Sequence, residues 1–283
     1  MTQQNGQDTG AGAMESLYPF LYSGTSDLPA VLAQVRASTV AKTKEITELR
    51  RRVCADDAAR LAACARDMAA AFAVGGRLFT FGNGGSATDA QQLATLFLSP
   101  APGPGTGPSP GPGTGPSPGP GTGPSPGPGT GSRLPPLAAF CLANDTSVIT
   151  ALCNDIGVDV VFARQIAAFG TKDDIAVGLS TSGNSGNLLR AFDEASRRGM
   201  LTIGLAGYEG GKMAELDSID YLFVAPSASV HRIQEAQTTI YQVLWELTVA
   251  EYAQLAASAQ PAGNTGNTGN TENPGNTGNA DRR

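Results

Sequence analysis

Two segments of glycine, asparagine and hydroxyl-bearing residues stand where they could bind an anion. One is GNGGS at 82–86 and the other is STSGNS at 180–185, and each lies between an apolar strand-like run and a helical pattern. Amides at the start of a helix favour an anion, glycine allows close approach, and hydroxyls donate to phosphate oxygens. Each segment alone also fits a tight strand-to-helix turn. Two such segments at strand ends of one sheet predict a phosphorylated ligand, while the lack of GxxxxGK[ST] or GxGxxG leaves nucleotide binding unsupported.

The elements that must position these segments alternate between strand and helix along the chain. Strands are predicted at 77–81, 137–142, 174–179, 201–205 and 221–224. Helices are predicted at 27–53, 56–74, 87–97, 148–152, 160–169, 186–198 and 230–256. Nearly continuous apolar strands alternating with helices are typical of a parallel sheet covered on both faces. The pattern therefore predicts a single α/β domain.

Low-complexity tracts mark the limits of this domain. Residues 1–15 are polar and are expected to be disordered, and 259–283 form a tail rich in Gly, Asn and Thr with the same expectation. Residues 101–131 repeat GPGTGPSP, whose prolines cannot join a sheet ladder. We expect this tract to be a solvated insertion, so that the domain spans 16–258 and is interrupted once.

Composition argues against several other classes of protein. The 283 residues carry a formal net charge of −6, which does not suit direct nucleic-acid binding through a basic surface. No run of about 18 apolar residues predicts a membrane span, and the first residues do not resemble a signal peptide. The chain has no CxxC pair, which indicates reduced thiols and a cytoplasmic protein. Its cysteines are Cys54, Cys64, Cys141 and Cys153.

Five motifs in order resemble the sugar isomerase (SIS) domain family, and within it the phosphoheptose isomerases. They are FGNGGSATDAQ at 81–91, ANDTSVITALCNDIG at 143–157, STSGNSGNLLRAF at 180–192, GGKMAELDSIDYLFV at 210–224 and HRIQEAQ at 231–237. The resemblance implies a three-layer α/β/α sandwich with a five-stranded parallel sheet, assembled as a homo-oligomer, a dimer or a tetramer. It also implies conversion of sedoheptulose 7-phosphate to D-glycero-D-manno-heptose 7-phosphate.

The resemblance also assigns substrate-binding residues. It implies that Ser180, Thr181, Ser182 and Ser185 grip the phosphate. It implies that the sugar meets Asn83 and Ser86 of the first loop, together with the pair Asn154 and Asp155.

The catalytic positions depart from the family pattern. Members carry His, Glu, Gln and His on two helices, where they hold zinc and supply the acid and the base. The matching residues here are Gln92, Leu96, Gln234 and Gln242, of which only Gln234 agrees. Neutral amides and a leucine are poor zinc ligands, so no metal is expected. Leucine cannot move a proton either, so other residues have taken over or the sugar phosphate is bound without turnover.

Few residues could take over. His231, the one histidine of the chain, is three residues before Gln234 and on the same side of the predicted helix. Glu235 is the neighbouring acid. A solvent-facing histidine at a helix start and a salt-bridged glutamate are the alternatives for these two residues.

Three functions stay open at this point. The first is a sugar-phosphate isomerase with altered catalytic groups. The second is a non-catalytic sugar-phosphate-binding protein, as a regulator or partner subunit. The third is a relative that binds the replication initiator, for which the acidic net charge is the one suggestive feature.

Overall fold

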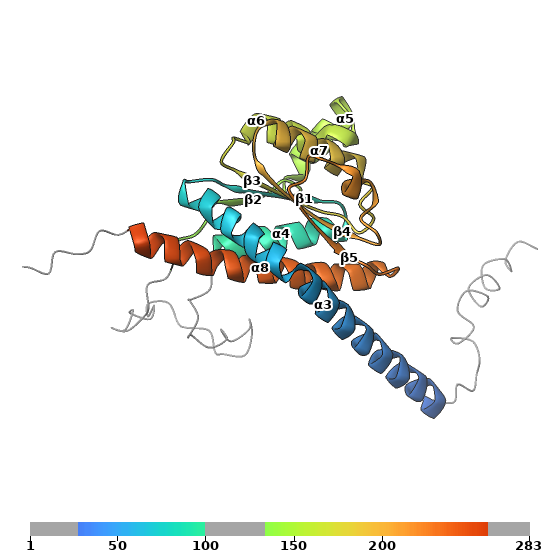
Figure 1. Cartoon of the computed structure of the whole chain (residues 1–283). Helices are drawn as coiled ribbons and strands as arrows, with labels where there is room; N and C mark the ends of the chain where they lie inside the picture. Colours follow the sequence, from blue (N-terminus) through green and yellow to red (C-terminus); the bar gives the residue numbers. More distant parts are fainter. Residues whose placement is uncertain (1–27, 100–133, 260–283) are drawn as a thin grey trace, which may run out of the picture.

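A computed structural model describes residues 28–99 and 134–259 of the chain (Figure 1). Its strands are β1 (Leu78–Gly82), β2 (Ala139–Cys141), β3 (Ile175–Leu179), β4 (Leu201–Gly207) and β5 (Tyr221–Ala225). They form one parallel sheet in the order β2-β1-β3-β4-β5. The helices are α3 (Leu28–Ala73), α4 (Gly85–Leu98), α5 (Thr146–Asp155), α6 (Val161–Phe169), α7 (Gly186–Arg197) and α8 (Val230–Ala259), with short 3-10 turns η1 (Val158–Val160) and η2 (Gly211–Glu215).

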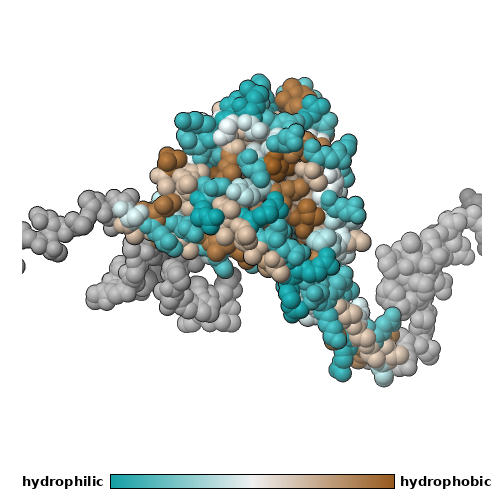
Figure 2. Space-filling model, viewed as in Figure 1, coloured by the Kyte–Doolittle hydropathy of each residue, from teal (hydrophilic) through white to brown (hydrophobic). Residues whose placement is uncertain are grey.

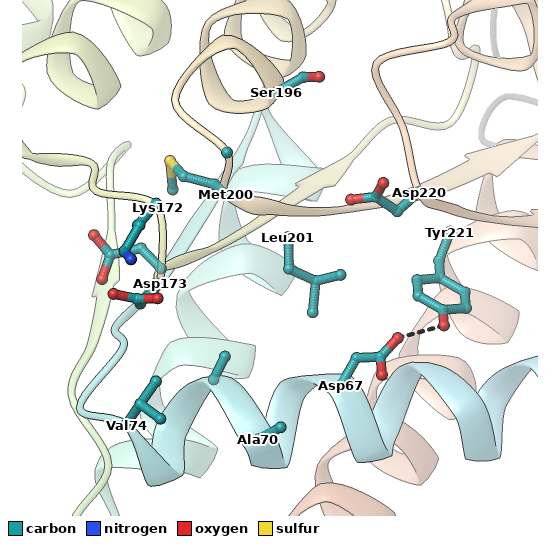
Figure 3. A pocket seen from close by; sticks show the side chains of 13 residues that line it. Asp67, Ala70, Val74, Lys172, Asp173, Ser196, Met200, Leu201, Asp220 and Tyr221 are labelled. Atoms are coloured by element: carbon teal, nitrogen blue, oxygen red, sulfur yellow. Dashed lines mark hydrogen bonds between the residues drawn. The ribbon is translucent and has the colours of Figure 1, made fainter.

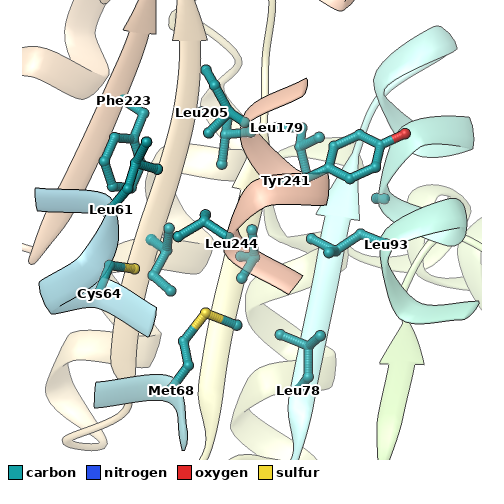
Figure 4. Close-up of a cluster of buried hydrophobic side chains, with 14 of the residues drawn as sticks. Leu61, Cys64, Met68, Leu78, Leu93, Leu179, Leu205, Phe223, Tyr241 and Leu244 are labelled. Atoms are coloured by element: carbon teal, nitrogen blue, oxygen red, sulfur yellow. The ribbon is translucent and has the colours of Figure 1, made fainter. Parts of the chain in front are cut away.

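Helices cover both faces of the sheet, as the continuous apolar strands predict. On one face, α3, α4 and α8 bury a large cluster that includes Leu61, Leu93 and Leu244 against the strands (Figure 4). On the other face, α6 and α7 pack Phe162 and Phe192 against Phe81 of β1. Every residue of β1 and β3 is buried. The three-layer α/β/α sandwich with five parallel strands is confirmed.

The first helical region differs from its prediction. We expect two helices, at 27–53 and 56–74, whereas α3 is one helix of 46 residues. Asp56 and Asp57 are good cap residues, but no glycine or proline breaks the chain there, and Asp57 pairs with Arg60 inside the helix at 2.9 Å. Buried Val53 and Leu61 continue one contact face across the expected break. Tertiary packing therefore overrides the local capping signal.

Other boundaries move by a few residues. β2 has three residues instead of the six predicted at 137–142, and α5 has ten instead of the five predicted at 148–152. Asp145 lengthens α5 at its start, because its carboxylate accepts hydrogen bonds from the amides of Ser147 and Val148.

The predicted low-complexity segments at 1–15 and 101–131 lie outside the described residues, and so does all but the start of the tail at 259–283. The division into a domain at 16–258 with one insertion therefore stays a proposal. In the described part of the chain, none of the helices is apolar over a length that would cross a bilayer.

Candidate functional site

The strand order places a crevice between β1 and β3. From β1 the chain moves to β2 on one side, and it later returns to β3 on the other side. Ligands of such sheets bind at this reversal, beyond the carboxyl ends of the strands. GNGGS follows β1 and STSGNS follows β3, so both predicted loops meet at the crevice. Asn83 of the first loop and Asn187, the second residue of α7 directly after the STSGNS loop, connect the two sides, because each side-chain amide donates to the other's oxygen, at 2.9 and 3.0 Å.

The STSGNS loop is held in shape by its own polar groups and by the β4–η2 connection. The hydroxyl of buried Ser180 accepts a hydrogen bond from the amide of Gly183 at 3.0 Å. Gly183 has φ +67°, and a Cβ there would collide with the carbonyl of Gly210. The Oδ1 atom of Asn184 accepts from the amide of Lys212 at 2.9 Å. The backbone of the loop is therefore fixed before any ligand arrives.

Hydroxyl groups of this loop remain open for a ligand. Thr181 and Ser182 are half-buried. Ser185 occupies the N-cap of α7, yet its side chain makes no capping hydrogen bond. Three hydroxyls therefore stand in the loop that leads into the first amides of a 12-residue helix, where an anion would gain both hydrogen bonds and the helix dipole.

Helix α8 reaches both loops through two glutamines. A Cβ on Gly85, the first residue of α4, would collide with Nε2 of Gln234, so the Gln234 amide lies directly on the GNGGS loop. The buried Gln237 donates from Nε2 to the Ser180 carbonyl at 3.0 Å. Its Oε1 atom is buried and has no hydrogen-bond partner within the described residues. Ser86 is also buried, at the start of α4.

The remaining predicted residues lie in different surroundings. Asn154 and Asp155 are exposed at the end of α5, where the Asn154 amide donates to Asp155 at 2.8 Å. In the described part of the chain, neither bonds to the two loops. His231 is exposed in the first turn of α8. The roles of these three residues stay predictions.

Glu235 belongs to an ion network between α3 and α8. Its carboxylate pairs with Arg232, which also lies 3.6 Å from Glu45. Arg50 donates to the Glu235 carbonyl at 3.3 Å. This pairing fits the salt-bridge alternative for Glu235, because its carboxylate is already engaged by a guanidinium.

The donor set does not fit the zinc that the family pattern implies. Gln92 and Gln242 are exposed, and Leu96 packs against the core cluster beneath α4. Across residues 28–99 and 134–259, no three His, Cys, Asp or Glu side chains gather closely enough to hold a metal ion. Zinc needs thiolate, imidazole or carboxylate ligands, which these positions do not supply.

We expect purified protein to contain far less than one zinc per chain, measured by atomic emission on samples loaded with zinc and then desalted. Restoring the family groups with Gln92→His, Leu96→Glu and Gln242→His should raise the content to about one, because three strong ligands then stand at the positions where the family pattern has them. The single Gln92→His variant is the control and should stay near zero. Stoichiometric zinc in the unaltered protein would show that these positions are wrongly matched.

Two cavities lie at opposite ends of the strands. One, of about 790 Å³, is lined by Asp67, Asp173, Asp220 and Tyr221 at the amino ends of the strands (Figure 3). Tyr221 donates to Asp67 at 2.6 Å, and this bond raises the pKa of Tyr221 to about 12. Its carboxylates would repel a phosphate. The other, of about 830 Å³, is lined by Ser182 and Asn184 of the STSGNS loop together with residues 208, 209, 211 and 226–228.

This fold and crevice define a protein of the SIS class, and residues 43–102 match the SIS domain family model. The chain is 38% identical over 200 residues to a phosphoheptose isomerase of Pelodictyon phaeoclathratiforme, covering 71% of this chain and 82% of that one. It is 37% identical over 204 residues to one of Solidesulfovibrio magneticus, covering 72% and 84%. The solved phosphoheptose isomerase of Neisseria gonorrhoeae superposes with TM-score 0.59 at 28% identity, covering 77% of this chain and 99% of that chain. The chain belongs to the phosphoheptose isomerase family.

Proposed function

We propose that this protein is a sugar-phosphate isomerase that converts sedoheptulose 7-phosphate to D-glycero-D-manno-heptose 7-phosphate. The observation that carries the proposal is the pair of loops joined by Asn83 and Asn187 at the strand-order reversal. Family membership supplies the substrate class. Incubation with sedoheptulose 7-phosphate and analysis of the products by NMR tests the proposal.

We assign the binding roles by the positions of the loops. Ser182 and Ser185, together with Thr181, hold the phosphate at the start of α7, while Ser180 shapes the loop from within. Asn83 and Ser86 face the sugar at the other side of the crevice, and Asn154 and Asp155 complete the set in our proposal. The Gln234 amide lies beside them and can donate a hydrogen bond to the sugar carbonyl.

The reaction passes through an enediol. A base must take the proton from C1 and return it at C2, and a second proton must pass from the C1 oxygen to the C2 oxygen. We assign the second transfer to His231, because an imidazole carries one nitrogen that can accept a proton and one that can donate a proton. Glu235 is the alternative for a supporting acid, although Arg232 holds it.

His231→Asn is expected to lower kcat by about 10²-fold, since it removes a proton-transfer group without removing a binding hydroxyl. The dissociation constant for sedoheptulose 7-phosphate should change by less than about threefold. Arg164→Gln on α6, an exposed residue outside both loops, is the control for a surface charge. Turnover that His231→Asn leaves intact would remove this residue from the mechanism.

A second function is favoured by one observation, the set of Gln92, Leu96 and Gln242 at the positions of the missing acid, base and metal ligands. A protein that binds a sugar phosphate at the same loops without changing it would be a regulator or the partner subunit of a complete isomerase. Tight binding of sedoheptulose 7-phosphate without any product would favour this function.

We also propose that the protein is a homo-oligomer, a dimer or a tetramer. The first half of α3 projects from the body of the molecule (Figures 1 and 2). Along it, Val31, Leu32, Val35 and Val40 are 44–57% exposed. A helix that is surrounded by solvent over this length is unusual, because most helical stability comes from packing of an apolar face. A second copy of the chain would supply that packing.

Replacing Leu32 and Val35 together by Glu is expected to reduce the molar mass measured by light scattering to that of one chain. Buried charges at such a contact have no partner and oppose association. Val158→Glu, on an equally exposed valine of η1, is the control and should leave the mass unchanged. A single-chain mass for the unaltered protein would contradict the proposed oligomer.

A cytoplasmic location is proposed on the state of the cysteines. All four lie in the described part of the chain, and none forms a disulfide. Cys64 is buried, and burial raises the pKa of its thiol, so this side chain behaves as an inert apolar group.

A further inference from the structure

An isomerase without the family's glutamate still needs a group that takes the carbon-bound proton. Helix α4 carries one acidic residue, Asp89, which none of the predicted roles uses. Asp89 follows Ser86 by three residues and Gly85 by four, so it lies one turn below the GNGGS loop. Asp89, Gln92 and Leu96 are spaced i, i+3 and i+7, which places them on one stripe of the helix. This stripe lacks the histidine and the glutamate of the family pattern at Gln92 and Leu96. It keeps one carboxylate, that of Asp89, about a turn closer to the GNGGS loop.

The structure places this stripe beside α8. Gln234 touches Gly85, and Tyr241 lies seven residues further along the same face of α8. Figure 4 shows the Tyr241 hydroxyl pointing toward α4. Burial raises the pKa of Tyr241, and the negative charge of Asp89 raises it further, as expected for neighbouring groups. Asp89 therefore faces the space between α4 and α8, on the side where Gln234 contacts the loop.

The carboxylate of Asp89 is available for chemistry. It is half-buried, and within the described residues it forms no hydrogen bond and no ion pair. Burial raises its pKa, which makes it a stronger base than a solvated aspartate. Glu235, the other acid near Gln234, is held by Arg232. Of these two carboxylates, Asp89 is the one that is free to accept a proton.

We propose that Asp89 is the base that moves the proton between C1 and C2 of the sugar, a role that rests on the isomerase function proposed above. Its carboxylate takes a proton from C1, and the C–H electron pair forms the C1=C2 double bond while the C2 carbonyl pair moves to its oxygen. A hydrogen bond from the Gln234 amide steadies that oxygen. The proton on the C1 oxygen passes to the C2 oxygen, and the C1 oxygen forms the new carbonyl. The double-bond pair then takes the proton back from Asp89 at C2, so no oxidant or metal is required.

The test separates formation of the enediolate from the later steps. Sedoheptulose 7-phosphate is incubated with protein in D2O, and exchange of the C1 proton and formation of the aldose are both followed by NMR. Asp89→Asn, which keeps the size of the side chain, is expected to lower both rates by about 10²–10⁴-fold. Its dissociation constant for the ketose should stay within about threefold. Asp89→Glu should restore part of the exchange. Asp173→Asn, at the amino ends of the strands, should behave as the unaltered protein.

The other variants make the outcomes distinct. His231→Asn should slow product formation and still exchange the C1 proton, because that proton needs only Asp89. Exchange and turnover that survive Asp89→Asn would overturn the role of Asp89 and leave the isomerase standing. Exchange lost in His231→Asn but kept in Asp89→Asn would transfer the carbon base to His231. Unaltered protein that binds the ketose and neither exchanges nor converts it would overturn the isomerase proposal itself, and the role of Asp89 with it.

Discussion

Thr181→Val is expected to weaken binding of sedoheptulose 7-phosphate by about 10- to 150-fold. Valine keeps the branched shape of threonine and removes one hydroxyl, and a lost hydrogen bond to a charged group costs about 1.5–3 kcal/mol. Thr181 is half-buried at the crevice, so the change leaves the core untouched. Calorimetric titration with the sugar phosphate measures the effect.

Ser182→Ala provides the second arm of this test, and it should weaken binding of sedoheptulose 7-phosphate by a similar factor. Ser182 accepts a weak hydrogen bond from the Asn184 amide at 3.3 Å, so its loss also loosens the loop slightly. Thr47→Val on α3 is the matched control, because it removes an exposed threonine hydroxyl far along the chain from both loops. Unchanged affinity in both loop variants would contradict the proposal that the STSGNS loop binds the phosphate.

Asp174→Ala is expected to lower the free energy of unfolding by about 3 kcal/mol. The carboxylate is 1% exposed and accepts hydrogen bonds from the Arg77 backbone at 2.8 Å and its guanidinium at 2.7 Å. It also accepts from the backbone amide of Thr171 at 2.8 Å. Removing it leaves these donors without their partner just before β1 and β3 begin. Urea unfolding followed by circular dichroism measures the change, with the exposed neighbour Asp173→Ala as the control at less than about 0.5 kcal/mol.

The same carboxylate sets a pH dependence with a defined sign. Burial alone would raise the pKa of Asp174, but hydrogen bonds from Arg77 and Thr171 outweigh it and hold the pKa below its ordinary value. A lowered pKa in the folded state means that this stabilisation is complete above the unfolded value of about 4 and is lost as the pH falls through the folded value. The stability difference between the unaltered protein and Asp174→Ala should therefore shrink in acid. A difference that grows as the pH falls would contradict the assignment.

Much of the fold could be predicted because its signals are local. The strands are nearly continuous apolar runs, so the sheet could be predicted, and so could the position of the STSGNS loop directly after β3. The break predicted near Asp56 was wrong. An aspartate that suits an N-cap does not end a helix when the residues before and after it pack against the same core. Here Val53 and Leu61 already face one core.

The rest of the site depends on contacts between distant parts of the chain. Asn83 and Asn187 are 104 residues apart, and Gln237 reaches Ser180 across 57 residues. A single sequence carries no record of such pairs. Asp89 is easily seen in the sequence three residues after Ser86, but the sequence does not show that it is half-buried near Tyr241. Burial and partners, which decide whether an acid can act as a base, come only from the folded chain.

One measurement tests the central claim most directly, which is that this family member isomerises a sugar phosphate without a metal. Protein treated with EDTA and desalted is incubated with sedoheptulose 7-phosphate, with and without added zinc, and the aldose is quantified by NMR. We predict that product forms at the same rate in both samples, because the positions of the family ligands hold Gln92, Leu96 and Gln242. Product that appears only with zinc, or no product in either sample, would contradict the account.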